Sequence, residues 1–102
     1  MIHDEIRSLL AAPASGDDAP SIDAIEDTLT AGYASALALE AERLRLERKL
    51  AEVASDLGDE ASERTSEVAT LGRRLADADC HIAQLRELLS SLRSRAARVR
   101  AT

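Results

Sequence analysis

Residues 68–99 read VATLGRRLADADCHIAQLRELLSSLRSRAARV. Apolar residues recur in this stretch at alternating spacings of three and four. They are Val68, Leu71, Leu75, Ala78, Ile82, Leu85, Leu89, Leu92, Ala96 and Val99. Several unbroken heptads of this period are typical of a coiled coil. The stretch therefore predicts one long helix whose a and d positions, called the seam below, pack against a partner helix.

A second run with the same period lies earlier in the chain. Its seam positions are Ile22, Ile25, Leu29, Gly32, Ala36, Leu39, Arg43, Leu46, Leu50, Val53 and Leu57. Gly58 can end a helix in a left-handed conformation, and Asp59 or Ser62 can cap the next one. We therefore predict an antiparallel hairpin with helices over 22–57 and 60–99 and a turn near 58–63. The alternative is one bent, continuous helix in a parallel dimer.

The hairpin makes a specific prediction about which residues face each other. If residue i faces residue 121 − i, every a position meets a d position, and small residues such as Gly32 meet large ones such as Leu89. Opposite charges flank the two seams, which favours pairing of the two helices with each other. The acidic flank consists of Glu26, Glu40, Glu42 and Glu47, and the basic flank of Arg74, Arg86, Arg93 and Arg95. Arg43 faces Ala78 in this register, which leaves its side chain room to reach Glu47 or Asp79.

The N-terminal part of the chain has a different residue pattern from the two long runs. Residues 1–12 carry Ile2, Ile6, Leu9 and Leu10 at helical spacing, which predicts a short amphipathic helix. Residues 13–21 contain two prolines and a glycine and predict a polar linker that ends this helix. Ser21 is the expected N-cap of the first long helix. The predicted organisation is thus a short helix, a linker, and a coiled-coil hairpin over 22–102.

Composition supports an all-α chain and narrows the function classes. Of the 102 residues, 45% are hydrophobic and 31% charged, which is too apolar for a disordered chain, whereas aromatic residues make up only 1%. The net charge of −6 argues against bulk attraction to nucleic acid. One cysteine, no apolar run near 20 residues and no signal-peptide pattern at the N-terminus predict a cytoplasmic protein that does not enter a membrane.

The first long helix is apolar on a second side, opposite its seam. This outer apolar face consists of Tyr33, Ala34, Leu37, Ala41 and Leu44. A helix that is apolar on both sides should be covered on both sides, either by residues 2–12 or by another chain. A two-fold dimer that forms a four-helix bundle is the simplest closed arrangement. We therefore predict a homo-oligomer, a dimer or a tetramer, whose interface contains the outer apolar face together with Leu88.

Two clusters have the residue types of a functional site. Asp77, Cys80, His81 and Gln84 share one helix face, as the ligands of a metal ion could, but one helix supplies at most three ligands and a solvated outer face is the favoured interpretation. Residues 64–102 carry four acidic and eight basic residues, and the positive charge is concentrated in the last turns. Those turns could contact an anion or nucleic acid through Arg93, Arg95, Arg98 and Arg100. Pairing with the acidic 17–27 stretch of the same hairpin is the alternative.

These patterns predict a non-enzymatic helical-hairpin protein that acts as a scaffold, adaptor or regulatory subunit through homo-oligomeric helix–helix contacts. We expect no catalytic residues, no cofactor and no metal. An unidentified protein partner is compatible with this interpretation, whereas a nucleic-acid partner is not expected. The alternative function is a nucleic-acid-associated or regulatory helical protein that uses the arginine-rich C-terminal end.

Overall fold

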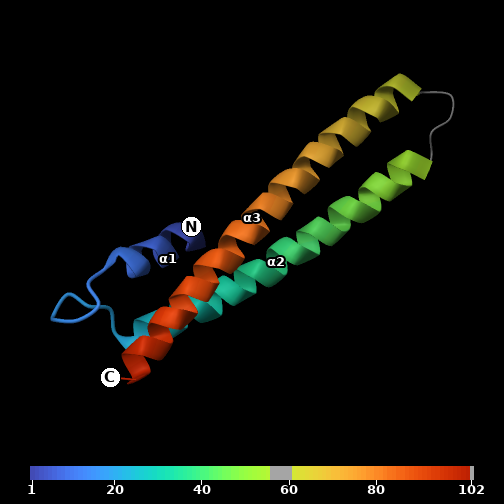
Figure 1. Cartoon of the computed structure of the whole chain (residues 1–102). Helices are drawn as coiled ribbons and strands as arrows, with labels where there is room; N and C mark the ends of the chain where they lie inside the picture. Colours follow the sequence, from blue (N-terminus) through green and yellow to red (C-terminus); the bar gives the residue numbers. More distant parts are fainter. Residues whose placement is uncertain (56–60, 102) are drawn as a thin grey trace. The chain divides into compact units, whose positions relative to one another are not determined.

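The computed structural model describes residues 1–55 and 61–101, all of whose regular structure is helical (Figure 1). Helix α1 spans Ile2–Ala11, α2 spans Ile22–Ser55 and α3 spans Ala61–Ala101. The two long helices pack as a hairpin (Figure 1), which confirms the predicted antiparallel pairing over the parallel alternative. The predicted turn residues Gly58 and Asp59, and the seam position Leu57, lie outside the described residues.

The start of α2 follows the predicted capping pattern. The backbone N–H of Ala24 donates to Ser21 Oγ over 3.1 Å, so the Ser21 side chain satisfies one of the amides that have no partner within the helix. Upstream of this cap, the linker turns at Gly16, whose φ of 97° suits a residue without a Cβ. The backbone N–H of Ala19 donates to the Gly16 carbonyl within this turn.

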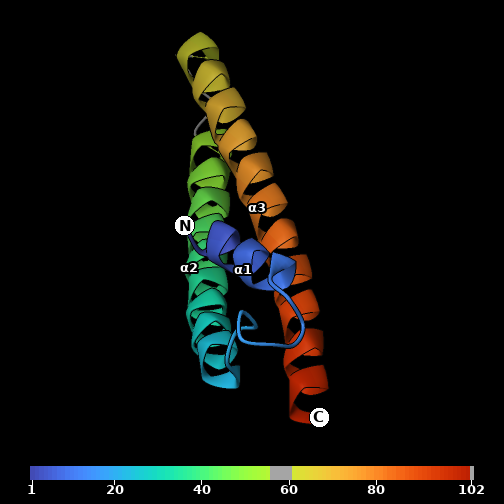
Figure 2. The ribbon, with the colours of Figure 1, turned by 90° about the vertical axis from the view of Figure 1, so that its left-hand side faces the viewer.

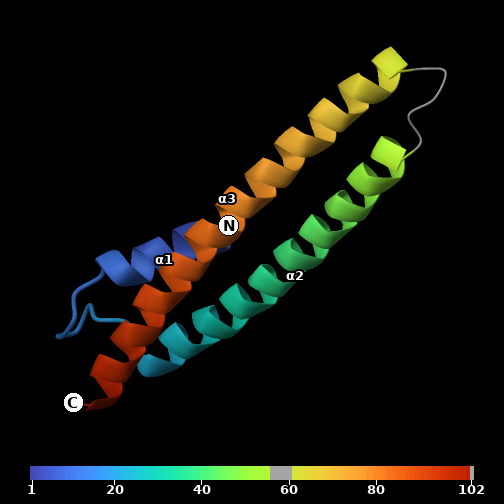
Figure 3. The ribbon, with the colours of Figure 1, turned by 45° about the vertical axis from the view of Figure 1, so that its right-hand side comes forward.

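The described residues form two compact units. Unit 1 consists of Met1–Leu37 with Ala83–Thr102, and unit 2 consists of Ala38–Ile82. In each unit a part of α2 runs antiparallel to a part of α3 (Figure 3). In unit 1, α1 crosses both of them (Figure 2). Each unit therefore has its own section of the seam.

The core of unit 2 is built from the predicted seam. One apolar cluster joins α2 and α3, and its members alternate between buried and half-buried. They are Leu46, Leu50 and Val53 of α2 with Val68, Leu71, Leu75 and Ala78 of α3. All seven are seam positions. Six of them form the three pairs that the register of 121 − i brings together, and the seventh, Ala78, is the residue that faces Arg43 in that register. The cluster thus confirms both the period and the register.

The core of unit 1 contains α1 as well as the seam. Ile25, Leu85 and Leu92 are almost completely buried, as is Ile6 of α1. Gly32 faces Leu89, as predicted: a Cβ added to Gly32 would collide with the Leu89 side chain and lie 3.5 Å from Ile6 Cδ1. Gly32 therefore leaves space for two large side chains, Leu89 from α3 and Ile6 from α1.

Candidate interaction surfaces

The outer apolar face of α2 is exposed. Tyr33 is 42% exposed, Leu37 68% and Leu44 45%, and the alanines at 34 and 41 are exposed as well. Although α1 belongs to the same unit as Leu37, it packs at Gly32 and Leu89 and leaves Leu37 bare. Residues 2–12 are one of the two coverings expected for this face, and they do not cover Leu37.

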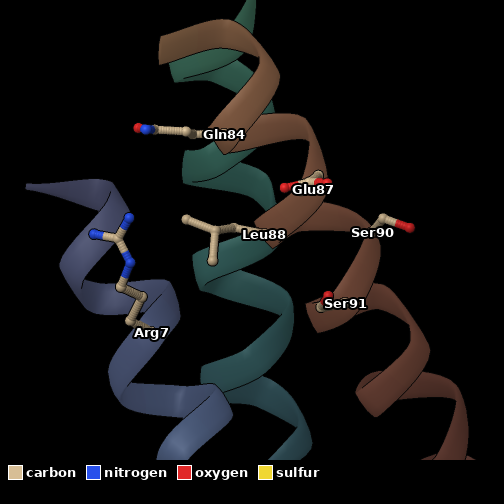
Figure 4. A pocket seen from close by; sticks show the side chains of 6 residues that line it. All are labelled: Arg7, Gln84, Glu87, Leu88, Ser90 and Ser91. Carbon is tan, nitrogen blue, oxygen red and sulfur yellow. The ribbon is translucent and has the colours of Figure 1, made fainter. Parts of the chain in front are cut away.

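Leu88 lies in a different setting from the other residues predicted to form an interface. It is half-buried on α3 and lines a shallow pocket of about 490 Å³, together with Arg7 of α1 and four polar residues of α3. Figure 4 shows Leu88, Gln84 and Arg7 directed toward the space between α1 and α3. The structure therefore groups Leu88 with α1 and not with the exposed side of α2.

Arg43 is a charged residue within the seam, and its side chain leaves the seam as predicted. Its Nε donates to Asp79 of α3, and its Nη1 lies 2.8 Å from Glu47 Oε1. The hydrogen bond to Asp79, and then the charges of Asp79 and Glu47, raise the pKa of the Arg43 guanidinium. The aliphatic part of the side chain can fill the layer opposite Ala78 while the charge lies at the edge of the hairpin.

A second ion-pair group joins the helices in unit 2 through Glu42. Its carboxylate lies 2.7 Å from Arg45 on the same helix and 3.6 Å from Arg74 on α3. The hydrogen bond from Arg45 and the nearby charges of Arg45 and Arg74 lower the pKa of Glu42. The contact with Arg74 confirms that charges flanking the two seams meet across the hairpin.

The four C-terminal arginines fall into two groups. Arg100 pairs with Glu26, which is the predicted contact with the acidic start of the hairpin. Arg95 is only 7% exposed and donates to three backbone carbonyls at the end of α1. Arg93 and Arg98 are exposed. Two of the four are therefore engaged in contacts inside the chain.

The role of Arg95 differs from the one that its flanking position indicates. The charge pattern predicts that it faces acidic residues of the first long helix, but its guanidinium binds the carbonyls of Leu10, Ala12 and Pro13. Sequence periodicity could not find this contact because it depends on where a segment more than 80 residues away returns to α3. The one local signal was that helix 2–11 has no basic residue in its last turn.

The residues of the suggested metal site lie on α3 and are exposed: Asp77, Cys80, His81 and Gln84. Within residues 1–55 and 61–101, no group of three or more His, Cys, Asp or Glu side chains is arranged to hold a metal ion. No helix in the described part of the chain is long and apolar enough to cross a membrane.

The fold and these surfaces define an all-α helical hairpin with a docked N-terminal helix. Comparison of the chain with protein-family models, with curated proteins and with solved structures finds no match.

Proposed function

We propose that this chain is a non-enzymatic interaction protein, a scaffold, adaptor or regulatory subunit, that associates with its own copies through the outer apolar face of α2. The observation that carries the proposal is the exposure of Leu37 and Leu44 on the side of α2 that faces away from the seam. Exposed apolar patches of this kind on small proteins mark association sites.

A second copy of the chain suits this face because the face is compatible with two-fold symmetry. The same residues would be supplied by both subunits, so leucines of one α2 could pack beside the exposed alanines of the other. Small residues allow the two helix backbones to approach closely, and a pair of hairpins joined along α2 would form a four-helix bundle. Tyr33 suits the edge of such an interface, where its ring is covered and its hydroxyl stays hydrated.

A non-enzymatic role is part of this proposal. A nucleophilic cysteine would need a base, an orienting group and an enclosed pocket, whereas Cys80 lies on an exposed face of α3. We do not propose nucleic-acid binding, because Arg95 and Arg100 make contacts within the chain and the net charge is negative.

The proposal is tested by the mass of the protein in solution. The double change Leu37→Glu with Leu44→Glu should reduce the mass measured by light scattering to that of one chain, because four carboxylates would be buried in a two-fold interface. Far-ultraviolet circular dichroism should show that helicity is retained, since both residues lie away from the seam.

The matched control places two glutamates elsewhere on the same helix. Ala31→Glu with Ala54→Glu changes exposed residues of α2 outside the outer apolar face and should leave the oligomer intact. A wild-type protein that has the mass of one chain at all concentrations would overturn the proposal. So would a Leu37→Glu, Leu44→Glu variant with the mass of the wild type.

A further inference from the structure

The apolar face of helix α1 has one fully buried side chain, Ile6, whereas Ile2, Leu9 and Leu10 are half-buried. Ile6 is 0% exposed, and its Cδ1 lies 3.5 Å from the position that a Cβ on Gly32 would occupy, beside the Leu89 side chain. Because residue 32 has no side chain, the side chains of Leu89 and Ile6 can both come close to the α2 backbone there, and we call the space left by the missing side chain the hollow at Gly32. We call the surface of unit 1 that contains Gly32, Leu89 and Arg95 the α1 site.

Arg95 binds the other end of the seated helix. Its Nη1 donates to the Leu10 carbonyl over 2.8 Å, and its Nη2 donates to the carbonyls of Ala12 and Pro13 over 2.5 and 2.6 Å. The last carbonyls of a helix lack partners within that helix, so a guanidinium placed there satisfies them and interacts favourably with the helix dipole. The α1 site thus recognises two features of a helix, an apolar side chain and an open C-terminal end.

Helix α1 has little stability of its own. It is 10 residues long, and no side chain caps its N-terminus, and helices of this length are marginal in water when isolated. Shallow pockets of about 490 and 610 Å³ lie beside it, the first at Arg7 and the second at Leu10. The apolar cluster of unit 2 contains no residue of α1, so this cluster would stay intact if α1 left the hairpin.

We propose that the α1 site is a reversible docking site for a short amphipathic helix, and that the α1 segment of a second copy can occupy it in place of the chain's own. Every copy carries both the segment and the site. The linker between α1 and α2 spans residues 12–21, and ten extended residues reach about 33 Å, which is enough to carry α1 to a neighbouring hairpin. Exchange of an identical element between copies needs no new contact.

This docking uses neither Leu37 nor Leu44, so it is independent of association through the outer apolar face. The probe is a synthetic peptide of residues 1–14 with a fluorophore at its N-terminus, added to the full-length chain and followed by fluorescence anisotropy. In the full-length Ile6→Asp variant the chain's own α1 cannot insert its apolar side chain, so the site is vacant. We expect the peptide to bind this variant at least tenfold more tightly than the wild type, in which the resident α1 competes.

Two matched changes identify the site. Adding Arg95→Gln to the Ile6→Asp chain removes the groups that bind the carbonyls, and adding Gly32→Leu fills the hollow; each should weaken peptide binding at least tenfold. A peptide that itself carries Ile6→Asp should not bind. The proposal is overturned if the wild-type peptide does not bind the Ile6→Asp chain, or if it binds the chains with Arg95→Gln or Gly32→Leu equally well.

A measurement on the unchanged chain keeps the test decisive should a variant fail to fold. Backbone amides of α1 should exchange with deuterium at least tenfold faster than those of α2 around Leu46, because α1 undocks while the hairpin stays folded. Equal exchange rates in the two segments would show that α1 opens only when the whole chain unfolds, and would contradict reversible docking.

Discussion

Arg43 and Arg95 are both charged residues of the hairpin helices, and their guanidinium groups have different partners. Arg43 is a seam residue whose charge reaches acidic side chains one turn along α2 and across the hairpin. Arg95 flanks the seam, yet its side chain is buried under the end of α1, where carbonyls replace the water that would hydrate it. The difference arises because, among the residues that the structure describes, a third helix packs on unit 1 and none packs on unit 2.

At this scale, Leu46 provides a direct test of the seam. It is buried in the apolar cluster of unit 2. We expect Leu46→Ala to lower the free energy of unfolding by about 2–5 kcal/mol, because it removes buried methyl groups and leaves a cavity. The measurement is the urea denaturation midpoint, with Arg48→Ala on an exposed part of α2 as the control. Equal midpoints for Leu46→Ala and the control would show that Leu46 is not buried in solution.

Glu42 predicts a specific dependence of stability on pH. Its pKa is lowered in the folded chain, mainly by the hydrogen bond from Arg45, so its ionised form is favoured by folding. The resulting stabilisation is fully present above the pKa of the unfolded chain and is lost as pH falls through the lower folded pKa. The difference in denaturation midpoint between wild type and Glu42→Gln should therefore shrink from pH 7 to pH 3.

The control for this effect is Glu67→Gln, a change of the same kind at an exposed position of α3. The difference in denaturation midpoint between wild type and Glu67→Gln should change less between pH 7 and pH 3 than the difference for Glu42→Gln. If Glu42→Gln and Glu67→Gln follow pH identically, the contacts with Arg45 and Arg74 do not favour the ionised carboxylate in solution.

At the scale of the elements, the three helices depend on different forces. Helices α2 and α3 are stabilised by the buried seam that they share, which is the usual source of helix stability in proteins. Helix α1 is too short for this and depends on its apolar face, in which Ile6 is fully buried, and on the guanidinium of Arg95. The long helices and the short one should therefore respond separately to mutation.

Two helical glycines form a matched pair that separates helix propensity from packing. Gly72 lies in α3 with open space around it, so Gly72→Ala should raise the free energy of unfolding by about 0.5–1 kcal/mol. Gly32→Ala should lack this gain, because the new Cβ would collide with the Leu89 side chain and force it to move. The denaturation midpoints of the two variants measure the contrast, and an equal gain in both would contradict the close packing at Gly32.

At the scale of the whole molecule, the proposed association through the exposed leucines of α2 predicts that stability depends on protein concentration. If folded chains associate through the outer apolar face, mass action stabilises the folded state, and the Tm of the wild type should rise with protein concentration. The Leu37→Glu, Leu44→Glu variant should show a Tm that does not change with concentration. A wild-type Tm that is constant across a hundredfold range of concentration would argue against association through this face.

Much of the hairpin follows from residue spacing alone. Two long runs at alternating spacings of three and four, with a glycine between them, predict an antiparallel hairpin and its register, although a continuous helix in a parallel dimer fits the same spacing. The contacts of Arg43 with Asp79 and of Gly32 with Leu89 follow from the predicted register. The physical reason is that a seam must align large residues with small ones and opposite charges with each other over many turns, and the register of 121 − i does so.

The placement of α1 was decided only by the tertiary structure. Its amphipathic pattern could be read from the sequence, but four apolar residues over three turns fit several faces of the hairpin, including the one that carries Leu37. Helix α1 docks at Gly32 and Leu89 because α2 and α3 together form the space there. It contacts Arg95 because the C-terminal end of α1 then lies beside that residue. A local period specifies which face of a helix is buried, whereas the partner of a short helix is specified by shape and by carbonyl positions that exist only after the hairpin has formed.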